Sequence, residues 1–294
     1  MKSALETIQE CISTQSQTLD LYNCGITNDS PEIQVLKECT HITTLDLRGN
    51  HLHKIAGINN LINLENLFLG NNLIQKIEGL EALVNLSHLE LYNNKLNKIE
   101  GLESLASLRV MNLDNNEISK IEGLYHLKLL ESLSLANNQI QKIEGLQELK
   151  KLSDLRLSGN QIQKIEGLEL LDNLKLIDLQ YNKIDKIRGL NHLKRLDSLV
   201  LSSNQIEKIE GLQGLKKLSC LYLAINRIQK IEGLDKLQQL TYLDMDHNKV
   251  SKIEGLDHLP NLNTLLLRGI PIENIEAIDP ILERGKTLNF KHTY

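Results

Sequence analysis

The chain has 294 residues, of which 41% are hydrophobic, and a formal net charge of −5 at pH 7. It has no stripe of clustered lysines and arginines such as nucleic-acid binding requires, so we expect no nucleic-acid partner. No apolar run approaches the roughly 20 residues that span a bilayer, and the N-terminus has no apolar signal segment, so we expect no membrane insertion. Every glycine belongs to a repeated turn or to a terminus, which leaves no phosphate-binding loop, and we expect no cofactor.

Aromatic residues make up only 3% of the chain and tryptophan is absent, so the core must be aliphatic. The four cysteines, Cys11, Cys24, Cys39 and Cys220, show neither C-x-x-C spacing nor a histidine at zinc-site spacing. Cys220 lies far from the others along the chain, which argues against a disulfide framework. These features favour a cytoplasmic protein, or a nuclear one in a eukaryotic cell, although export by a non-standard route stays open.

The first 41 residues are expected to cap the array that follows. Residues 18–26 (T-L-D-L-Y-N-C-G-I) form a degenerate first repeat, in which Cys24 takes the place that later repeats give to asparagine. Ser30 and Pro31 predict the N-cap and first position of a short helix that extends to Cys39. Before them, apolar residues at helical spacing predict a capping helix, namely Ala4, Leu5, Ile8 and Ile12.

Residues 42–275 repeat with a strict period of 22, in the pattern L-x-x-L-x-L-x-x-N-x-I-x-x-I-E-G-L-x-x-L-x-x. In L-x-L the apolar side chains alternate with variable ones, which predicts a strand with one buried face. One unit cannot bury that face alone, whereas units stacked in parallel can. We therefore predict an α/β solenoid, continuous as one domain, with a curved parallel sheet on its concave face and short 3₁₀ or helical turns on its convex face.

Two residue types recur at fixed places in the repeat. Asparagine returns in ten successive repeats, from Asn50 to Asn248, and glycine in ten, from Gly57 to Gly255. An inward polar residue must be hydrogen-bonded, so the asparagines predict a ladder between coils. The glycines predict a tight turn where a side chain would be a hindrance. After the repeats, residues 276–294 predict a C-terminal cap with a helix over 276–284 and a closing strand over 287–291.

Two solvent-facing columns hardly vary. Lysine runs from Lys54 to Lys252, and glutamate from Glu78 to Glu276 with one interruption at Arg188. A binding site for one partner seldom needs ten identical elements, so we interpret these columns as a solvated charge ladder. Each exposed pair contributes about 0–1 kcal/mol.

The outward positions of the predicted strands vary from repeat to repeat and contain seven acids and three arginines, with Phe and Tyr between them. Parallel strands lie about 4.8 Å apart, so these positions form one surface, and exposed aromatics flanked by charges commonly anchor protein interfaces. We expect a monomer that binds a protein partner with a basic and apolar contact surface. The candidate residues form an N-terminal patch of Asp46, Arg48, Phe68, Glu90, Tyr92 and Asp114, a C-terminal patch of Tyr222, Tyr242, Asp244, Asp246, His247 and Arg268, and Asp178 between the two.

Metal and catalytic interpretations are weaker. In the C-terminal patch the aspartates beside His247 suggest a cation site, but Arg268 lies one strand from Asp246 in the same column, which favours an ion pair. His51 and His53 lack a third ligand. A smooth sheet offers no deep cleft for a Ser–His–Asp or Cys–His set. We therefore expect no metal, no catalytic residues and no enzymatic activity.

The motif L-x-x-L-x-L-x-x-N-x-I-x-x-I-E-G-L resembles the 22-residue class of leucine-rich repeats. The regulatory subunit of protein phosphatase type one typifies that class, and bacterial internalins share the repeat length. The resemblance covers residues 42–275 and implies a leucine-rich-repeat solenoid. In the phosphatase-binding family the partner lies against acidic and aromatic mid-strand residues, and Asp46, Phe68, Glu90 and Asp178 match that kind of residue.

Three functions follow from the patches and the resemblance. The one we expect is a non-catalytic scaffold or adaptor that binds a protein on its concave face. The alternatives are a regulatory subunit of a protein phosphatase and a secreted bacterial effector or adhesin.

Overall fold

The structure, a computed structural model, describes residues 2–270 and 287–289. Its contacts divide the chain into two compact units. Unit 1 contains Met1–Ile140 and Glu144–Leu152, and unit 2 contains Gln141–Ile143 and Ser153–Tyr294. The expectation of one continuous domain stays a prediction.

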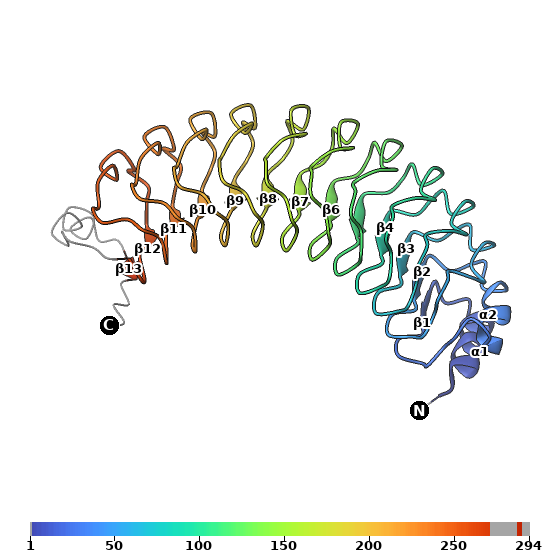
Figure 1. Cartoon of the computed structure of the whole chain (residues 1–294). Helices are drawn as coiled ribbons and strands as arrows, with labels where there is room; N and C mark the ends of the chain where they lie inside the picture. The colour runs from blue at the N-terminus through green and yellow to red at the C-terminus, as the bar shows by residue number, and fades with distance from the viewer. Residues whose placement is uncertain (1, 271–286, 290–294) are drawn as a thin grey trace. The chain divides into compact units, whose positions relative to one another are not determined.

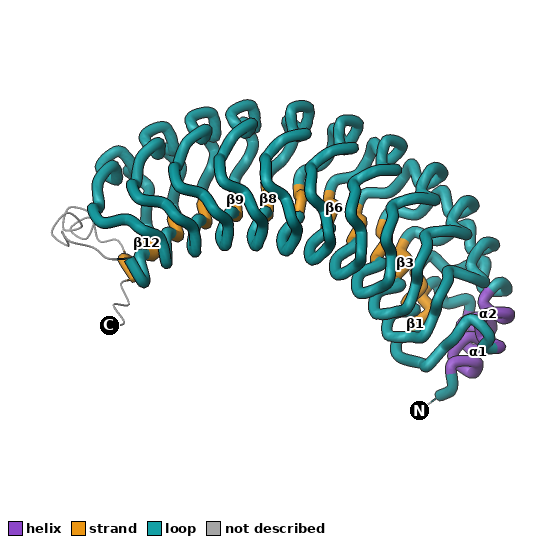
Figure 2. Tube along the Cα trace, in the orientation of Figure 1, coloured by secondary structure: helices purple, strands orange, loops and turns teal. Residues whose placement is uncertain are grey.

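Unit 1 begins with two helices, α1 (Ala4–Thr14) and α2 (Pro31–Leu36), which pack against each other at its N-terminal end (Figure 1). The unit contains six three-residue strands, the first of which lies between the two helices in the chain, and they pair in parallel in chain order. The strands lie along one side of the coils, and the connecting loops lie on the other side (Figure 2). The strands are β1 (Thr18–Asp20), β2 (Thr44–Asp46), β3 (Asn66–Phe68), β4 (His88–Glu90), β5 (Val110–Asn112) and β6 (Ser132–Ser134).

Unit 2 repeats the arrangement with seven parallel strands, again paired in chain order. The last strand pairs with the one before it, so the predicted closing strand is confirmed over residues 287–289. The helix expected over residues 276–284 lies outside the described residues. The strands are β7 (Asp154–Arg156), β8 (Leu176–Asp178), β9 (Ser198–Val200), β10 (Cys220–Tyr222), β11 (Tyr242–Asp244), β12 (Thr264–Leu266) and β13 (Thr287–Asn289).

The central residue of each strand through β12 is buried, and its two neighbours point outward with partial exposure in most strands. This alternation is what the L-x-L pattern predicts. The interior of both units consists mainly of leucine and isoleucine side chains and also contains two methionines, Met111 and Met245, so the aliphatic core is confirmed.

The asparagine ladder is also confirmed. The Asn138 amide donates to the carbonyl oxygens of Leu113 and Leu135 at 3.0 and 3.1 Å, and its Oδ1 accepts the N–H of Ile118 at 3.0 Å. Asn182 makes the equivalent bonds within unit 2. Each asparagine thus ties a coil to the one before it and satisfies backbone groups that the turn leaves free.

Most of the repeated glycines lie where the backbone of the preceding coil passes close by. Gly123 has φ +72°, and a Cβ there would lie 2.6 Å from the carbonyl oxygen of Ile99. The following leucines form separate turns, in which Leu127 N–H donates to Leu124 and Leu130 N–H donates to Leu127. Because these bonds start three residues apart, they do not build a continuous helix. The return segment therefore consists of isolated turns, and the described repeats contain no short helix.

The N-terminal cap differs from expectation in detail. Ser3 and Glu6 form a reciprocal capping box at the start of α1, whose buried face includes Cys11 while Leu5 and Ile12 are only half-buried. Helix α2 ends at Leu36 rather than at Cys39, and its N-cap hydroxyl accepts a hydrogen bond from Thr27 instead of capping the helix. Within the described residues, no helix is both long and apolar enough to cross a membrane.

Candidate functional site

The N-terminal patch lies on the strand side of unit 1, where Asp46, Phe68 and Glu90 occupy equivalent places in β2, β3 and β4. Arg48 Nε lies 3.0 Å from both Asp46 carboxylate oxygens, and one of its terminal nitrogens lies 2.5 Å from Oδ2. This bond is the main reason why the pKa of Arg48 rises above its ordinary value. A second contact joins Arg48 to Glu90 at 3.8 Å. Arg48 is thus held between two carboxylates on different strands.

Phe68 lies inside this charged frame. The Arg48 guanidinium carbon is 5.1 Å from the centre of the Phe68 ring, a cation–π distance. On its other side, the ring meets His88 edge-on with the ring centres 5.2 Å apart. His88 Nε2 in turn lies 3.2 Å from a Glu90 carboxylate oxygen. Phe68 is therefore half-buried, whereas its position in a variable outward column suggested a solvent-exposed ring. His88 also belongs to this cluster, although it was not among the predicted site residues.

Tyr92 completes the cluster because Gly70 makes room for it. A Cβ on Gly70 would lie 2.5 Å from two atoms of the Tyr92 ring, so the ring covers the backbone at the end of β3. Tyr92 is near enough to Arg48 to contribute, after Asp46, to the raised pKa of the guanidinium. Tyr92 thereby links the end of this strand to the Arg48 frame.

Asp114, the sixth predicted member, is held elsewhere. Its Oδ1 accepts hydrogen bonds from the Ser134 hydroxyl at 2.6 Å and from the Ala136 N–H at 2.7 Å. The structure therefore brings together five of the six residues. Asp114 is instead bonded to the end of the next strand, β6.

The acids of the mid-strand column share a second role. Asp46, Asp178 and Asp244 each accept the backbone N–H of the residue two places later, at 2.9, 2.9 and 3.0 Å. Asn112 does the same with its amide oxygen at 2.9 Å. These side chains satisfy an N–H that the short strand leaves unpaired, in the manner of an Asx turn.

The C-terminal patch lies within unit 2. The Tyr222 and Tyr242 rings stack with their centres 4.9 Å apart and a tilt of 38°. Asp246 pairs with Arg268 at 3.1 Å, as predicted, and its other oxygen accepts the Arg268 N–H at 2.7 Å. Asp244 forms no ion pair in the described part of the chain. Burial, and secondarily the charge of Asp246, raises the pKa of Asp244 above its ordinary value.

The uniform columns behave as a charge ladder in unit 1. Lys98 lies 3.6 Å from Glu100 in its own coil and 3.9 Å from Glu122 in the next, and Lys76 bridges Glu78 and Glu100 in the same way. The lysine side chains are more than half exposed, so each contact contributes little to stability.

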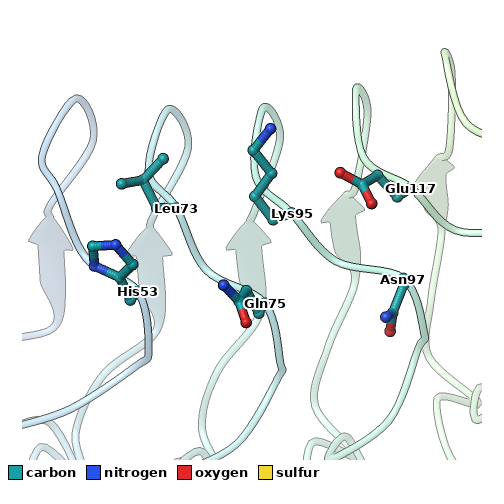
Figure 3. A pocket seen from close by; sticks show the side chains of 6 residues that line it. All are labelled: His53, Leu73, Gln75, Lys95, Asn97 and Glu117. Atoms are coloured by element: carbon teal, nitrogen blue, oxygen red, sulfur yellow. The ribbon is translucent and has the colours of Figure 1, made fainter.

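An open depression of about 410 Å³ lies on the flank of unit 1, beyond the strand ends (Figure 3). Its six side chains come from successive coils and mix charged, amide and apolar types without converging on a point (Figure 3). Among the described residues, no three His, Cys, Asp or Glu side chains gather as a metal site. The lining residues are His53, Leu73, Gln75, Lys95, Asn97 and Glu117.

The repeats match two family models. The model described as "Leucine-rich repeat" matches residues 149–252, and the model described as "Leucine Rich repeats (2 copies)" matches residues 40–82, 62–104, 84–126 and 106–148. Together they span residues 40–252. None of the curated proteins searched matches the chain significantly.

Solved structures show the same architecture. An internalin (inlF) from Listeria monocytogenes is 25% identical, with 99% of this chain and 95% of the internalin covered and a TM-score of 0.77. Internalin C2 from the same organism is 32% identical over 60% of this chain and 79% of its own, with a TM-score of 0.57. The leucine-rich repeat domain of APL1B, at 20% identity, coverage of 100% and 94% and a TM-score of 0.78, shows the fold alone. With its 22-residue period, its asparagine ladder and these matches, the chain belongs to the leucine-rich repeat family, whose members generally serve as scaffolds for protein–protein interaction.

Proposed function

We propose that this protein is a non-catalytic binding module that holds a protein partner on the strand side of unit 1, with the N-terminal patch as its anchor. The observation that carries the proposal is the cluster of Arg48, Phe68, His88 and Glu90, in which an aromatic ring is fixed within a frame of charges. Side chains already held in one arrangement lose little conformational freedom on binding, which favours affinity.

The charges of the cluster indicate the partner. Asp46 and Glu90 both contact Arg48, so two carboxylates share one guanidinium, and His88 adds a charge only when protonated. The frame is therefore acidic with an apolar centre. A partner that offers lysine or arginine around an apolar side chain complements it.

The test combines Phe68→Ala with Glu90→Lys, and measures thermal unfolding and capture of a partner from native lysate side by side. The matched control is Tyr125→Ala with Glu122→Lys, which makes the same two changes on the loop side, where Tyr125 is exposed. We expect the patch variant to remain folded and to weaken capture at least tenfold, equivalent to about 1.4 kcal/mol. The control should capture the partner as the unchanged protein does.

If the folded patch variant captures the partner as well as the unchanged protein does, the N-terminal patch is not the anchor of the binding site. Loss of capture by the loop-side control would move the site to the charge ladder. Phe68 packs against Arg48 and His88, so a variant that unfolds is replaced by Glu90→Lys alone, which leaves the ring in place.

Two narrower functions each have one supporting observation. Similarity to an internalin over 99% of the chain favours a bacterial effector or adhesin, and binding of the purified protein to host cells tests it. The adjacent register of Asp46, Phe68 and Glu90 favours a phosphatase regulator. A change in the activity of the type-one catalytic subunit on addition of this protein tests that alternative.

A further inference from the structure

One column of the repeat adopts a left-handed backbone in every described coil. The residue directly before each ladder asparagine has positive φ, and in unit 1 this residue is Gly49 in one coil and Asn71, Asn93, Asn115 or Asn137, with φ between 52° and 55°, in the others. Asparagine and glycine tolerate this conformation. The unit 1 sequence therefore fits its backbone.

Unit 2 departs from that rule. After Gly159 in its first coil, the same place holds Tyr181, Ser203, Ile225 and His247, with φ of 53°, 58°, 55° and 54°. For a bulky or β-branched residue such a φ is a genuine outlier that costs stability. We call these four residues the left-handed column of unit 2.

The neighbouring coil imposes this backbone, whatever the side chain. The N–H groups of Tyr181, Ser203 and Ile225 donate to the carbonyl oxygens of the next coil at 3.0, 2.8 and 2.7 Å. The residue that follows each of them is a buried ladder asparagine, Asn226 in the case of Ile225. The same backbone hydrogen bond and the same buried asparagine are present in unit 1, where asparagine holds the left-handed position. Asparagine would therefore fit the backbone at these four positions of unit 2 too.

The two large hydrophobic side chains of this column are more than half exposed, so they gain little burial in return. Tyr181 and Ile225 are 60% and 52% exposed, which places both among the most exposed large hydrophobic residues described. Two strand spacings separate them, about 10 Å. Between them the Ser203 hydroxyl is buried without a hydrogen-bond partner, a second unmet cost at the same place.

Cationic residues follow this apolar pair along the coils. Lys183, Arg227 and Lys249 are exposed, and each follows a column residue by two places, across a buried asparagine. Their N–H groups donate to the preceding coil at 2.8 Å, so the three lie on stacked coils. In the part of the chain that the structure describes, none of the three forms an ion pair. Lys183 reaches only an amide oxygen, at 3.5 Å.

Acidic neighbours do not offset these charges fully. Two places further along the coils the residues are Asp185, Glu207, Gln229 and Ser251, so the acids stop before Arg227 and Lys249. The exposed His247 lies at that same end. The surface is therefore apolar at its centre and positive at one end.

We propose that this surface, the flank patch of Tyr181, Ile225, His247, Lys183, Arg227 and Lys249, is a second binding site, and that it binds an acidic protein segment carrying apolar side chains. Exposed aromatic and aliphatic groups supply the contact, and the unpaired cations select an acidic occupant. The flank patch thus differs in place and in charge preference from the unit 1 surface proposed above. Strain retained at exposed residues is typical of functional sites.

The first test concerns strain. Tyr181→Asn combined with Ile225→Asn should raise the melting temperature, because asparagine accepts the left-handed backbone. Asn115→Ile in unit 1 is the matched reverse change and should lower it. If the double variant melts at or below the temperature of the unchanged protein, the argument from strain fails.

The second test uses short synthetic peptides as probes, labelled for fluorescence anisotropy. They combine glutamate with leucines spaced two, three or four residues apart, and each has a counterpart with lysine in place of glutamate. We expect at least one glutamate peptide to bind the full chain. Its affinity should fall at least tenfold with Tyr181→Asn/Ile225→Asn, and also with Lys183→Glu/Arg227→Glu/Lys249→Glu.

Three results overturn the proposal: no glutamate peptide binds, the lysine peptides bind equally well, or both variants bind as the unchanged protein does. Ser203→Asn, which lies between the two hydrophobic residues, serves as a stabilised control that should keep its binding. None of these changes touches the N-terminal patch. A failure here therefore leaves the proposed function standing, and capture through Phe68 and Glu90 tests that separately.

Discussion

At the scale of the single residue, one side chain often has two roles in this protein. Asp46 accepts the N–H of Arg48, and also holds the Arg48 guanidinium against Phe68. The carboxylate thus completes the short strand and arranges the surface at once. Variation along the mid-strand column is therefore compatible with a structural role, since aspartate and asparagine both accept this bond.

Asp244 allows that structural role to be separated from charge. Asn112 makes the same backbone bond in β5, so Asp244→Asn should keep it. Burial raises the pKa of Asp244, which means that the folded state binds its proton at a pH where the unfolded chain has lost it. The contribution of Asp244 to the stability of the unchanged protein therefore falls as pH rises from the ordinary aspartate pKa through the raised one.

We expect Asp244→Asn to be more stable than the unchanged protein at neutral pH, with a difference that narrows toward about pH 4, where aspartate titrates. Urea unfolding at several pH values measures this difference. A variant that is less stable at every pH would show that the Asp244 carboxylate stabilises the fold. A gain in stability that does not depend on pH would show that the gain has a cause other than the ionisation of Asp244.

At the scale of the element, the sequence predicted those features that recur in every repeat. The strands, the asparagine ladder and the glycine turns recur in every repeat. Aligning the repeats therefore shows which residue type each of these features requires. Features that occur once were harder to predict. The end of α2 at Leu36 and the burial of Cys11 depend on how the cap packs, which no periodicity encodes.

The candidate site was predictable in part for the same reason. Strand register alone placed Asp46, Phe68 and Glu90 side by side. It could not show that Arg48 turns toward Phe68, or that His88 joins the cluster, because those contacts depend on side-chain conformation. The left-handed column had a visible signal in its change from asparagine to Tyr181 and Ile225, but hydrophobic periodicity does not report φ.

The ladder itself predicts the effect of Asn138→Ala. The change removes an amide that bonds Leu113, Leu135 and Ile118, and leaves buried backbone groups without partners. We expect a loss of about 1–3 kcal/mol for each group left unsatisfied, measured by urea unfolding. Gln139→Ala changes the exposed neighbouring residue and should unfold as the unchanged protein does. Equal stability of the two variants would mean that the ladder does not hold the coils together.

At the scale of the whole molecule, the repeated columns and the variable columns of the repeat have different roles. Repeated columns build each unit and neutralise its loop side, as the lysine–glutamate contacts in unit 1 show. Variable columns give unit 1 an acidic aromatic surface and unit 2 a positive apolar one. A leucine-rich repeat scaffold of this kind can recognise two chemically different partners with separate residues.

The central claim is that the strand side of unit 1 holds the partner, and photocrosslinking locates that contact directly. A benzophenone amino acid is placed at Phe68 in one protein and at Tyr125, exposed on the loop side, in another. Each protein is irradiated in native lysate, and its adducts are separated and identified. We predict a discrete adduct from position 68 that the unmodified protein competes away, and no such adduct from position 125. A competed adduct from position 125, with none from position 68, would contradict the claim.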